Sequence, residues 1–347
     1  MRRPVLARAL RALALVLALA APAAAFEVEE QSRFGPDDAP RTLRILSTTD
    51  TVIFAPLLER FLADQPGLAI DYVVAASTEV YAALHDEAAA FDIAVSSAMD
   101  LQMKLANDGF ARVHRAPGTL ALPPWARWRD QLFAFAQEPV VAILSRAGFE
   151  GLPLPRTRSD LVDLMRENPD RFRGRVGTYD PNLSGAGYLF ATQDARQSDT
   201  SWRLAEVMGA LQPRLYAASG DMIRDLQAGR LILATNVLGS YAVPRLPPGG
   251  DGLVLEPADY THVLLRTALI PRTAEAPDLG AAFLDFLLSP EGQRLIAAAG
   301  LPAIDEAALV AGQHLRPIRL DPGLLVFVDP LKRRRFLDEW SAAMVRD

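Results

Sequence analysis

Residues 42–101, TLRILSTTDTVIFAPLLERFLADQPGLAIDYVVAASTEVYAALHDEAAAFDIAVSSAMDL, repeat one pattern of strand, polar turn and helix. Short apolar segments at 42–47, 68–74 and 91–97 predict strands, and each ends in serine or threonine or is followed by them within three residues. Apolar positions at helical spacing follow each turn, for example from about Phe54 onward. Strands that alternate with helices in this way favour an α/β fold with an open, mostly parallel sheet.

The same order of elements recurs in the middle of the chain. A strand at 175–180 leads to Ser184–Gly187 and a helix, and Ser219 opens a helix that Gly229 ends. A further strand follows at 231–237. These segments predict a second open sheet flanked by helices.

Two long apolar segments predict how the two sheets are connected. Residues 132–144 and 253–270 are too long for ordinary strands, and polar residues interrupt each of them. Strands that pass from one lobe to the other account for both. We therefore expect lobe one to contain residues 42–135 plus 260–347 and lobe two to contain residues 136–259.

The N-terminus has the features of an export signal. Residues 1–25 combine a basic start, an apolar stretch of about ten residues and the small residues Ala23–Ala25. This stretch is shorter than the roughly 20 residues that span a bilayer, so a cleaved signal peptide is preferred over an uncleaved anchor. Residues 26–41, rich in acidic residues, are expected to form a flexible lead. We expect the protein to be soluble in the periplasm.

Composition excludes several classes of function. The chain has 347 residues and a formal net charge of −6, which argues against general binding of nucleic acid. It has no cysteine, which removes disulfides, thiol nucleophiles and cysteine-ligated metals. A monomer with a core large enough to fold without disulfides is expected.

Motifs for catalysis are absent. The four histidines are scattered without metal-ligand spacing, and no P-loop or G-x-G-x-x-G is present. The residues around Ser184 lack the glycines of a nucleophile elbow. We therefore predict no catalytic residues, no metal site and no cofactor, and an enzyme built on the same fold is kept as a minor alternative.

The polar turns predict a binding site. Helix N-termini at the ends of parallel strands present N–H groups and a positive dipole, which favour an anion. Each of these serines and threonines taken alone is more often an ordinary helix cap than a binding residue. Together, on two lobes, they predict a cleft that closes on a small polar solute. The candidate residues are Ser47, Thr48, Thr49, Ser77, Thr78, Ser96, Ser97, Ser184, Gly185, Gly187 and Ser219.

Several segments give the chain a family resemblance. They are STEVY at 77–81, DIAVSSAMDL at 92–101, EPVV at 138–141, NVLGSY at 236–241 and FLDFLLSPEGQRLI at 283–296. With these segments the chain resembles the periplasmic solute-binding proteins of ABC importers, in the branch that includes binders of ferric ion and of phosphorylated sugars. The resemblance implies the type II periplasmic-binding-protein fold, in which two α/β lobes on a strand hinge close over the solute. It also implies a membrane permease as the partner.

The resemblance also bears on the solute. Ferric members hold iron with two adjacent tyrosines, whereas here Tyr241 is followed by Ala242. Tyr241 and Glu79 join the candidate binding residues, but together they offer too few anionic oxygens for iron. We therefore expect a small anionic solute, a carboxylate or a phosphate ester. Binding of ferric ion and a role as the sensing subunit of a membrane sensor kinase are the alternatives.

Overall fold

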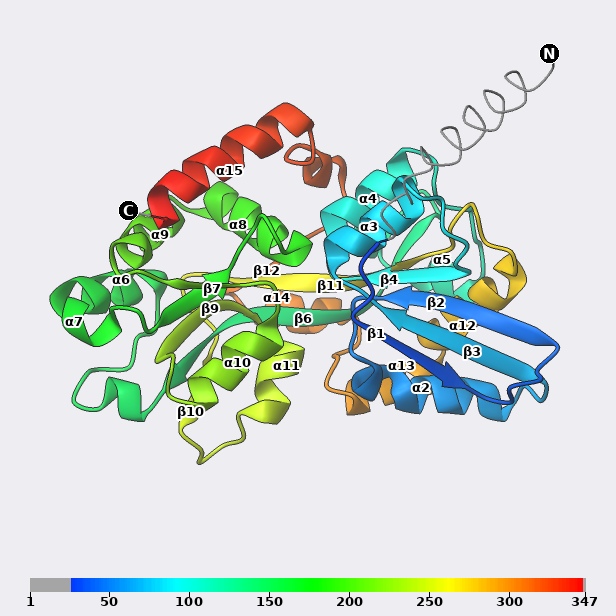
Figure 1. The fold of residues 1–347 in the computed structure, drawn as a ribbon, viewed down its shortest axis with the longest axis horizontal. Coiled ribbons are helices and arrows are strands. Elements are labelled where there is room, and N and C mark those ends of the chain that lie inside the picture. Colours follow the sequence, from blue (N-terminus) through cyan, green and yellow to red (C-terminus); the bar gives the residue numbers. More distant parts are fainter. Residues whose placement is uncertain (1–25, 346–347) are drawn as a thin grey trace, which may run out of the picture.

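The computed structural model describes residues 26–345, which form two α/β lobes lying side by side (Figure 1). A mixed sheet runs through both lobes. In chain order, its strands are β1 (Glu30–Phe34), β2 (Arg41–Ser47), β3 (Leu68–Val74), β4 (Ile93–Ser96), β5 (Arg127–Trp128), β6 (Leu132–Ser145), β7 (Val176–Tyr179), β8 (Arg214–Tyr216), β9 (Leu233–Leu238), β10 (Gly252–Leu255), β11 (Thr261–Leu269) and β12 (Leu315–Pro317). The hydrogen-bonded order is β1-β3-β2-β4-β11-β6-β9-β7-β8. Among residues 26–345, no helix has the length and apolar character needed to cross a membrane.

Lobe one is built on the parallel strands β3, β2 and β4, with β1 and β11 antiparallel at their sides. Its helices are α2 (Thr51–Ala63), α3 (Ser77–His85), α4 (Met99–Asn107), α5 (Pro117–Ala121), α12 (Pro277–Leu288), α13 (Pro290–Ala298) and α14 (Glu306–Ala311). Helices α2, α12 and α13 cover one face of the sheet, and α3 and α4 cover the other (Figure 1). The buried aromatic rings of Phe54, Tyr72 and Phe135 pack together in the core between α2 and the sheet.

Lobe two is built on the parallel strands β8, β7 and β9, next to the second half of β6. Its helices are α6 (Arg158–Glu167), α7 (Pro169–Phe172), α8 (Gly185–Gln197), α9 (Thr200–Ala210), α10 (Ser219–Gln227), α11 (Gly239–Arg245) and α15 (Pro330–Met344). Short 3₁₀ turns lie at Pro124–Ala126, Ala147–Phe149 and Pro322–Leu325. The predicted fold class, two α/β lobes each with a mostly parallel sheet, is confirmed.

Strands β6 and β11 carry the chain between the lobes. Strand β6 pairs with β11 from Phe133 to Pro139 and then with β9 from Val140 to Leu144. The sequence-based prediction of a crossing strand at this apolar segment is therefore confirmed. The switch of partner lies at Pro139 and Val140, a few residues beyond the expected lobe boundary at 135 and 136.

The expected flexible lead at 26–41 is wrong, because residues 30–34 within it form a paired strand. Strand β1 lies antiparallel to β3 with Glu30 opposite Val74 and Phe34 opposite Ile70. Gly35, at φ +89°, then turns the chain toward β2. Backbone pairing at the edge of a sheet needs no buried side-chain pattern, so the acidic composition of this segment conceals the strand. Residues 1–25, expected to be a signal peptide, lie outside the described residues.

The expected assignment of residues 260–347 to lobe one is wrong for helix α15. Its buried Phe336, Trp340 and Met344 belong to the same core cluster as Leu161 of α6. Gly209 on α9 permits this contact, because a Cβ there would lie 2.1 Å from the carbonyl oxygen of Ala343. The chain therefore returns to lobe two after Phe327 and lies across α8 and α9 (Figure 1).

Truncation of Trp340 tests this assignment of α15. Its side chain is buried in lobe two, and removing a buried tryptophan costs roughly 3–5 kcal/mol. We expect Trp340→Ala to lower the free energy of unfolding in urea by that amount. Leu331→Ala, at a position of the same helix that is 74% exposed, is the control and is expected to change it by less than about 0.5 kcal/mol. Equal effects would contradict the packing of α15.

Candidate functional site

A hollow of about 350 Å³ lies between the two lobes. Lobe one contributes the loops that follow β2, β3 and β4, and lobe two contributes the N-terminal ends of α8, α10 and α11. The carboxyl ends of the parallel strands thus meet at this cleft, which is where open α/β sheets hold ligands. The residues lining the cleft are Glu29, Thr48, Asp50, Ala75, Ala76, Ser77, Ser97, Tyr179, Leu183, Ser184, Ala186, Ala217, Ala218, Ser219, Gly220, Asp221, Arg224, Leu238 and Tyr241.

Six of the thirteen predicted binding residues line this cleft. From lobe one these are Thr48, Ser77 and Ser97, and from lobe two Ser184, Ser219 and Tyr241. The structure therefore brings together residues that lie up to 193 positions apart in the sequence.

Three of the other predicted residues are buried parts of their own loops. The hydroxyl of Ser47 accepts a hydrogen bond from the amide of Thr49 at 3.0 Å, and Ser96 accepts one from Ala98 at 3.1 Å. The hydroxyl of Thr49 accepts one from Arg266 Nη1 at 2.6 Å. These side chains shape the loops and do not line the cleft.

The remaining four predicted residues also lie outside the cleft lining. Thr78 is on the first turn of α3, and Glu79 accepts a hydrogen bond from the amide of Glu27 at 2.9 Å. Gly185 and Gly187 permit close packing, because a Cβ at Gly185 would lie 2.8 Å from Ser77 Oγ and one at Gly187 would lie 2.4 Å from Tyr179 Cβ. The Gly185 contact joins the two lobes.

Helices α3 and α10, which begin at the cleft, have no side-chain cap. The N-cap of α3 is Ala76 and that of α10 is Ala218, and neither can accept a hydrogen bond. By contrast, α8 is capped by Ser184, whose hydroxyl accepts a hydrogen bond from the amide of Gly187 at 3.1 Å. The first-turn N–H groups of α3 and α10 therefore face the hollow from opposite lobes without a side-chain acceptor. Both are places where a bound anion would be stabilised.

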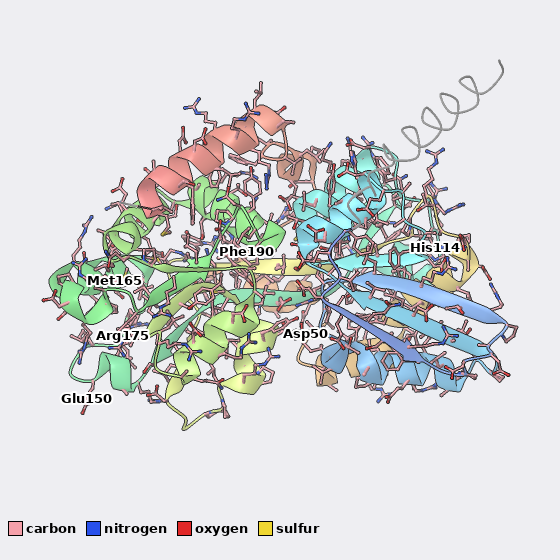
Figure 2. The ribbon with its side chains drawn as sticks, in the orientation of Figure 1. Asp50, His114, Glu150, Met165, Arg175 and Phe190 are labelled. Atoms are coloured by element: carbon pink, nitrogen blue, oxygen red, sulfur yellow. The ribbon has the colours of Figure 1, made fainter. Side chains whose placement is uncertain are left out.

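Asp50 is a cleft residue that the sequence-based list missed. It lies at the junction of the lobes (Figure 2), where its Oδ1 accepts a hydrogen bond from the hydroxyl of Tyr241 at 2.8 Å. Arg245 Nη2 is 3.6 Å from Asp50 Oδ2. Burial raises the pKa of Tyr241, which keeps its phenol protonated as the donor. Asp50 belongs to the polar run at 47–51 that follows the first predicted strand. That position was the sequence feature that could have identified it as a cleft residue.

A buried ion pair lies beside this contact, where the strands cross. Arg266 Nε donates to Glu138 Oε1 at 2.7 Å, and both side chains are at most 1% exposed. Arg266 Nη2 is buried without a hydrogen-bond partner among the described residues. The guanidinium is 5.8 Å from the ring centre of Tyr241. Arg266 is the one arginine, lysine, aspartate or glutamate in the apolar strand β11. This isolated charge was the sequence feature that could have identified a buried ion pair.

The charged groups in the cleft are mostly acidic. Glu29, Asp50 and Asp221 line it, together with Arg224, which forms an ion pair with Asp221. Burial raises the pKa of Glu29, and the nearby charges of Asp50 and Glu27 raise it further. The cleft thus combines backbone and hydroxyl donors with carboxylate acceptors. A solute that uses both would present an anionic group and several hydroxyls.

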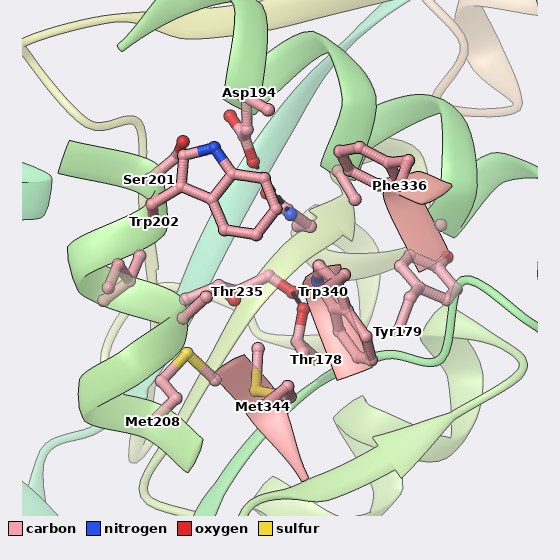
Figure 3. Close-up of a pocket in the computed structure, with 16 residues that line it drawn as sticks. Thr178, Tyr179, Asp194, Ser201, Trp202, Met208, Thr235, Phe336, Trp340 and Met344 are labelled. Carbon is pink, nitrogen blue, oxygen red and sulfur yellow. Dashed lines mark hydrogen bonds between the residues drawn. The ribbon is translucent and has the colours of Figure 1, made fainter. Parts of the chain in front are cut away.

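A smaller cavity lies behind the cleft inside lobe two (Figure 3). Tyr179 belongs to the walls of both, and its hydroxyl is 2.6 Å from Ser219 Oγ. Trp202, Trp340 and Met344 close the far side. At about 50 Å³, this cavity is too small for a solute. It separates the back of the cleft from α15.

Comparison with known proteins identifies the family. A family model described as bacterial extracellular solute-binding protein matches residues 44–301. The chain belongs to this solute-binding protein family. The resemblance seen in the sequence is therefore confirmed, and proteins of this family serve ABC transporters by partnering with membrane permeases. They are extracellular or periplasmic binding proteins, not enzymes.

Solved structures agree with this assignment. The substrate-binding protein of an ABC transporter from Agrobacterium tumefaciens is 33% identical, with a TM-score of 0.85, over 91% of this chain and 98% of that chain. The fructose-6-phosphate-bound periplasmic binding protein AfuA from Actinobacillus pleuropneumoniae is 17% identical, with a TM-score of 0.72, over 88% and 99%. Iron-bound HitA from Pseudomonas aeruginosa is 16% identical, with a TM-score of 0.64, over 88% and 99%. Among curated proteins, none matches this chain.

The contact between Asp50 and Tyr241 predicts how the solute-binding protein opens. One hydrogen bond of this kind contributes about 1 kcal/mol, which is roughly a fivefold change in an equilibrium. We expect Tyr241→Phe to shift the solute-free protein toward the open form by about that factor. Tyr216→Phe is the matched control, because its hydroxyl bonds to Asp225 at 2.7 Å within lobe two.

The lack of cysteine in the solute-binding protein makes the measurement direct. Glu87→Cys on lobe one and Glu206→Cys on lobe two, both exposed positions, accept a pair of fluorescent labels. Energy transfer between the labels should fall in the Tyr241 variant and stay constant in the Tyr216 variant. Unchanged transfer in both would show that the Asp50–Tyr241 bond does not hold the lobes together.

Proposed function

We propose that this solute-binding protein captures a small phosphate ester that carries several hydroxyl groups and delivers it to the permease of an ABC importer. The observation that carries the proposal is the pair of uncapped helices, α3 and α10, which meet at the cleft from opposite lobes. Export to the periplasm through residues 1–25 and action as a monomer belong to the same proposal.

The anionic end of the solute would be held by backbone groups. Aspartate, asparagine, serine and threonine are preferred at N-caps, and alanine there forgoes about 1 kcal/mol of capping energy. Ala76 and Ala218 leave room for an external acceptor in the place of a capping side chain. An oxyanion between them would accept from both helices, and Arg224 adds a nearby positive charge. It would also hold the two lobes together.

The hydroxyl-bearing end would meet the carboxylates. Asp50, Glu29 and Asp221 offer acceptors, and Ser97 and Thr48 offer hydroxyls. These carboxylates repel a bare dianion, so they favour a solute whose charge is confined to one end. A phosphate ester of a polyol combines the two requirements, whereas a tricarboxylate would place charge against Asp50. The fold also accommodates such a ligand in AfuA, whose structure contains fructose-6-phosphate.

The cleft is less suited to ferric ion. Iron bound by tyrosine requires the phenolate, but Tyr241 is buried, has a raised pKa and donates its proton to Asp50. Residues 26–345 contain no cluster of three or more histidine, aspartate or glutamate side chains that could hold a metal. Proteins of the same fold that bind iron therefore supply a comparison for the fold and not for the solute here.

Capping the two helices tests the proposal. We expect Ala76→Asp and Ala218→Asp each to stabilise the solute-free protein by about 1 kcal/mol, because the new carboxylate accepts from the first-turn N–H groups. Each should also weaken binding of the phosphate ester tenfold or more, roughly 1.4 kcal/mol, by occupying and repelling its place. Titration calorimetry with sugar phosphates chosen from a thermal-shift screen measures the affinity, and urea unfolding measures the stability.

Ala76→Asn and Ala218→Asn are the matched controls. Asparagine caps a helix as well as aspartate but adds no charge, so these variants should bind more tightly than the aspartate variants. In the screen, a ligand at 100 times its Kd adds about 2.7 kcal/mol of stability, while the unphosphorylated sugar should add far less. Stabilisation by ferric salts alone, or full affinity in both aspartate variants, would refute the proposal.

A further inference from the structure

A second hollow, of about 340 Å³, shares no lining residue with the cleft. It lies where the last turns of α8 meet strand β11 and the segment that leads from β12 to Pro322–Leu325. Its polar walls are formed by Gln193, Arg196, Gln197, His262, Arg316 and Arg319. Helix α8 therefore has one end at the cleft and the other at this hollow.

The three arginines of the hollow are not balanced by carboxylates. Arg196, Arg316 and Arg319 form no ion pair with any residue from 26 to 345, whereas the buried Arg158 and Arg266 each pair with a carboxylate. Arg196 and Arg316 donate only to backbone oxygens: Arg196 to Gly323 at 3.4 Å, and Arg316 to Gln313 at 2.7 Å and Leu315 at 2.9 Å. The one carboxylate in the lining, Asp321, is used as a cap and accepts from the amide of Gly323 at 2.7 Å.

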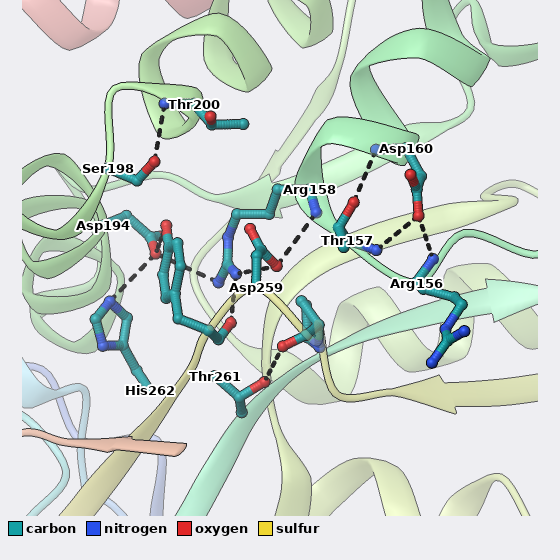
Figure 4. Close-up of polar contacts among 12 residues, drawn as sticks. Arg156, Thr157, Arg158, Asp160, Asp194, Ser198, Thr200, Asp259, Thr261 and His262 are labelled. Atoms are coloured by element: carbon teal, nitrogen blue, oxygen red, sulfur yellow. Dashed lines mark hydrogen bonds and ion pairs between the residues drawn. The ribbon is translucent and has the colours of Figure 1, made fainter. Parts of the chain in front are cut away.

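A buried histidine also forms part of the wall. His262 is 4% exposed and lines the hollow, while its Nε2 lies 3.3 Å from Asp194 Oδ1 (Figure 4). That contact lacks hydrogen-bond geometry, so Nε2 is a buried nitrogen without a hydrogen-bond partner.

Asp194, which faces the imidazole ring of His262, is held in its charged form. Burial alone would raise the pKa of Asp194, but Arg158, His262 and Asn236 lower it to about 2. Its Oδ1 also accepts from the hydroxyl of Tyr260 at 2.9 Å, and its Oδ2 from Asn236 at 3.0 Å. The Nε2 atom of His262 thus faces a charged carboxylate, and the ring contributes to the wall of the hollow.

We propose that this hollow is a second anion-binding site, one that takes inorganic phosphate or the phosphate group of a small molecule. The guanidinium groups of Arg196 and Arg319 supply free donors with the planar geometry that suits phosphate oxygens. The amides of Gln193 and Gln197 supply further donors at the rim. The volume suits a small ligand and falls at the lower end of the usual range for ligand pockets.

The site does not depend on the solute of the cleft. Its residues come from α8 of lobe two, from the crossing strand β11 and from the segment after β12. A phosphate bound there would bridge all three. An acidic segment of a partner protein could meet the same arginines, but the buried position of His262 favours a small ligand that enters the hollow.

The test uses a protein whose cleft is blocked. In the double variant Ala76→Asp/Ala218→Asp, titration with inorganic phosphate at low ionic strength should still show one binding event. Adding Arg196→Gln and Arg319→Gln should weaken that event by about tenfold or more, because two charge-assisted contacts are lost. Both arginines are exposed, so the folded structure should persist, and circular dichroism checks this.

Arg294→Gln/Arg335→Gln is the matched control, since both side chains are exposed at 74% and 82% and lie outside the hollow. It should leave phosphate affinity unchanged. The ring resonances of His262, assigned with His262→Gln, should shift when phosphate is added. No binding in the cleft-blocked protein, or equal affinity in the arginine variant and its control, would overturn the proposal. If the cleft-blocked protein binds no phosphate and the arginine variant no longer stimulates the permease, these arginines would instead be assigned to docking of a partner protein.

Discussion

The two antiparallel strands β6 and β11 are the constraint on which the structure depends. Both pass from one lobe toward the other, and Arg266 and Glu138 form a buried ion pair between them. A buried pair of this kind costs desolvation energy but is strongly destabilising to break, so loss of either partner would destabilise the crossing. Arg266 also holds the hydroxyl of Thr49. The first loop of the cleft is thus tied to the hinge.

The cleft follows from this arrangement. Parallel strands on both sides of the hinge end at the same place, so their loops and the helices after them face each other. Helices α3 and α10 are among those that begin at alanine instead of a capping residue, and the contact from Asp50 to Tyr241 bridges the lobes. The lobes are thus in contact across the cleft. The ends of α3 and α10 have no side-chain acceptor, and that is the role we give to the solute.

Much of the fold could be predicted from sequence, because strand and helix periods are local. The strands after Thr42, the crossing segment at 132–144 and the polar turns of both lobes were predicted in this way. The edge strand β1 and the position of α15 could not be predicted. An edge strand pairs through its backbone, and the apolar stripe with Phe336 and Trp340 suits a core in either lobe.

The site was predictable to a similar extent. Hydroxyl residues at strand ends mark the cleft, but burial decides which of them face it, so Ser47 and Ser96 serve their own loops while Thr48 and Ser97 line the hollow. Asp50 and Arg266 depend on contacts with residues far away in the chain. Ala76 and Ala218 matter because they lack a capping side chain. A sequence motif is defined by residues that are present, so it does not reveal such positions.

A crystal structure of the protein with a sugar phosphate tests the central claim most directly. The account predicts phosphate oxygens within hydrogen-bond distance of the first-turn amides of both α3 and α10, with sugar hydroxyls toward Asp50. A phosphate bound elsewhere in the cleft, with these amides still unoccupied, would contradict it.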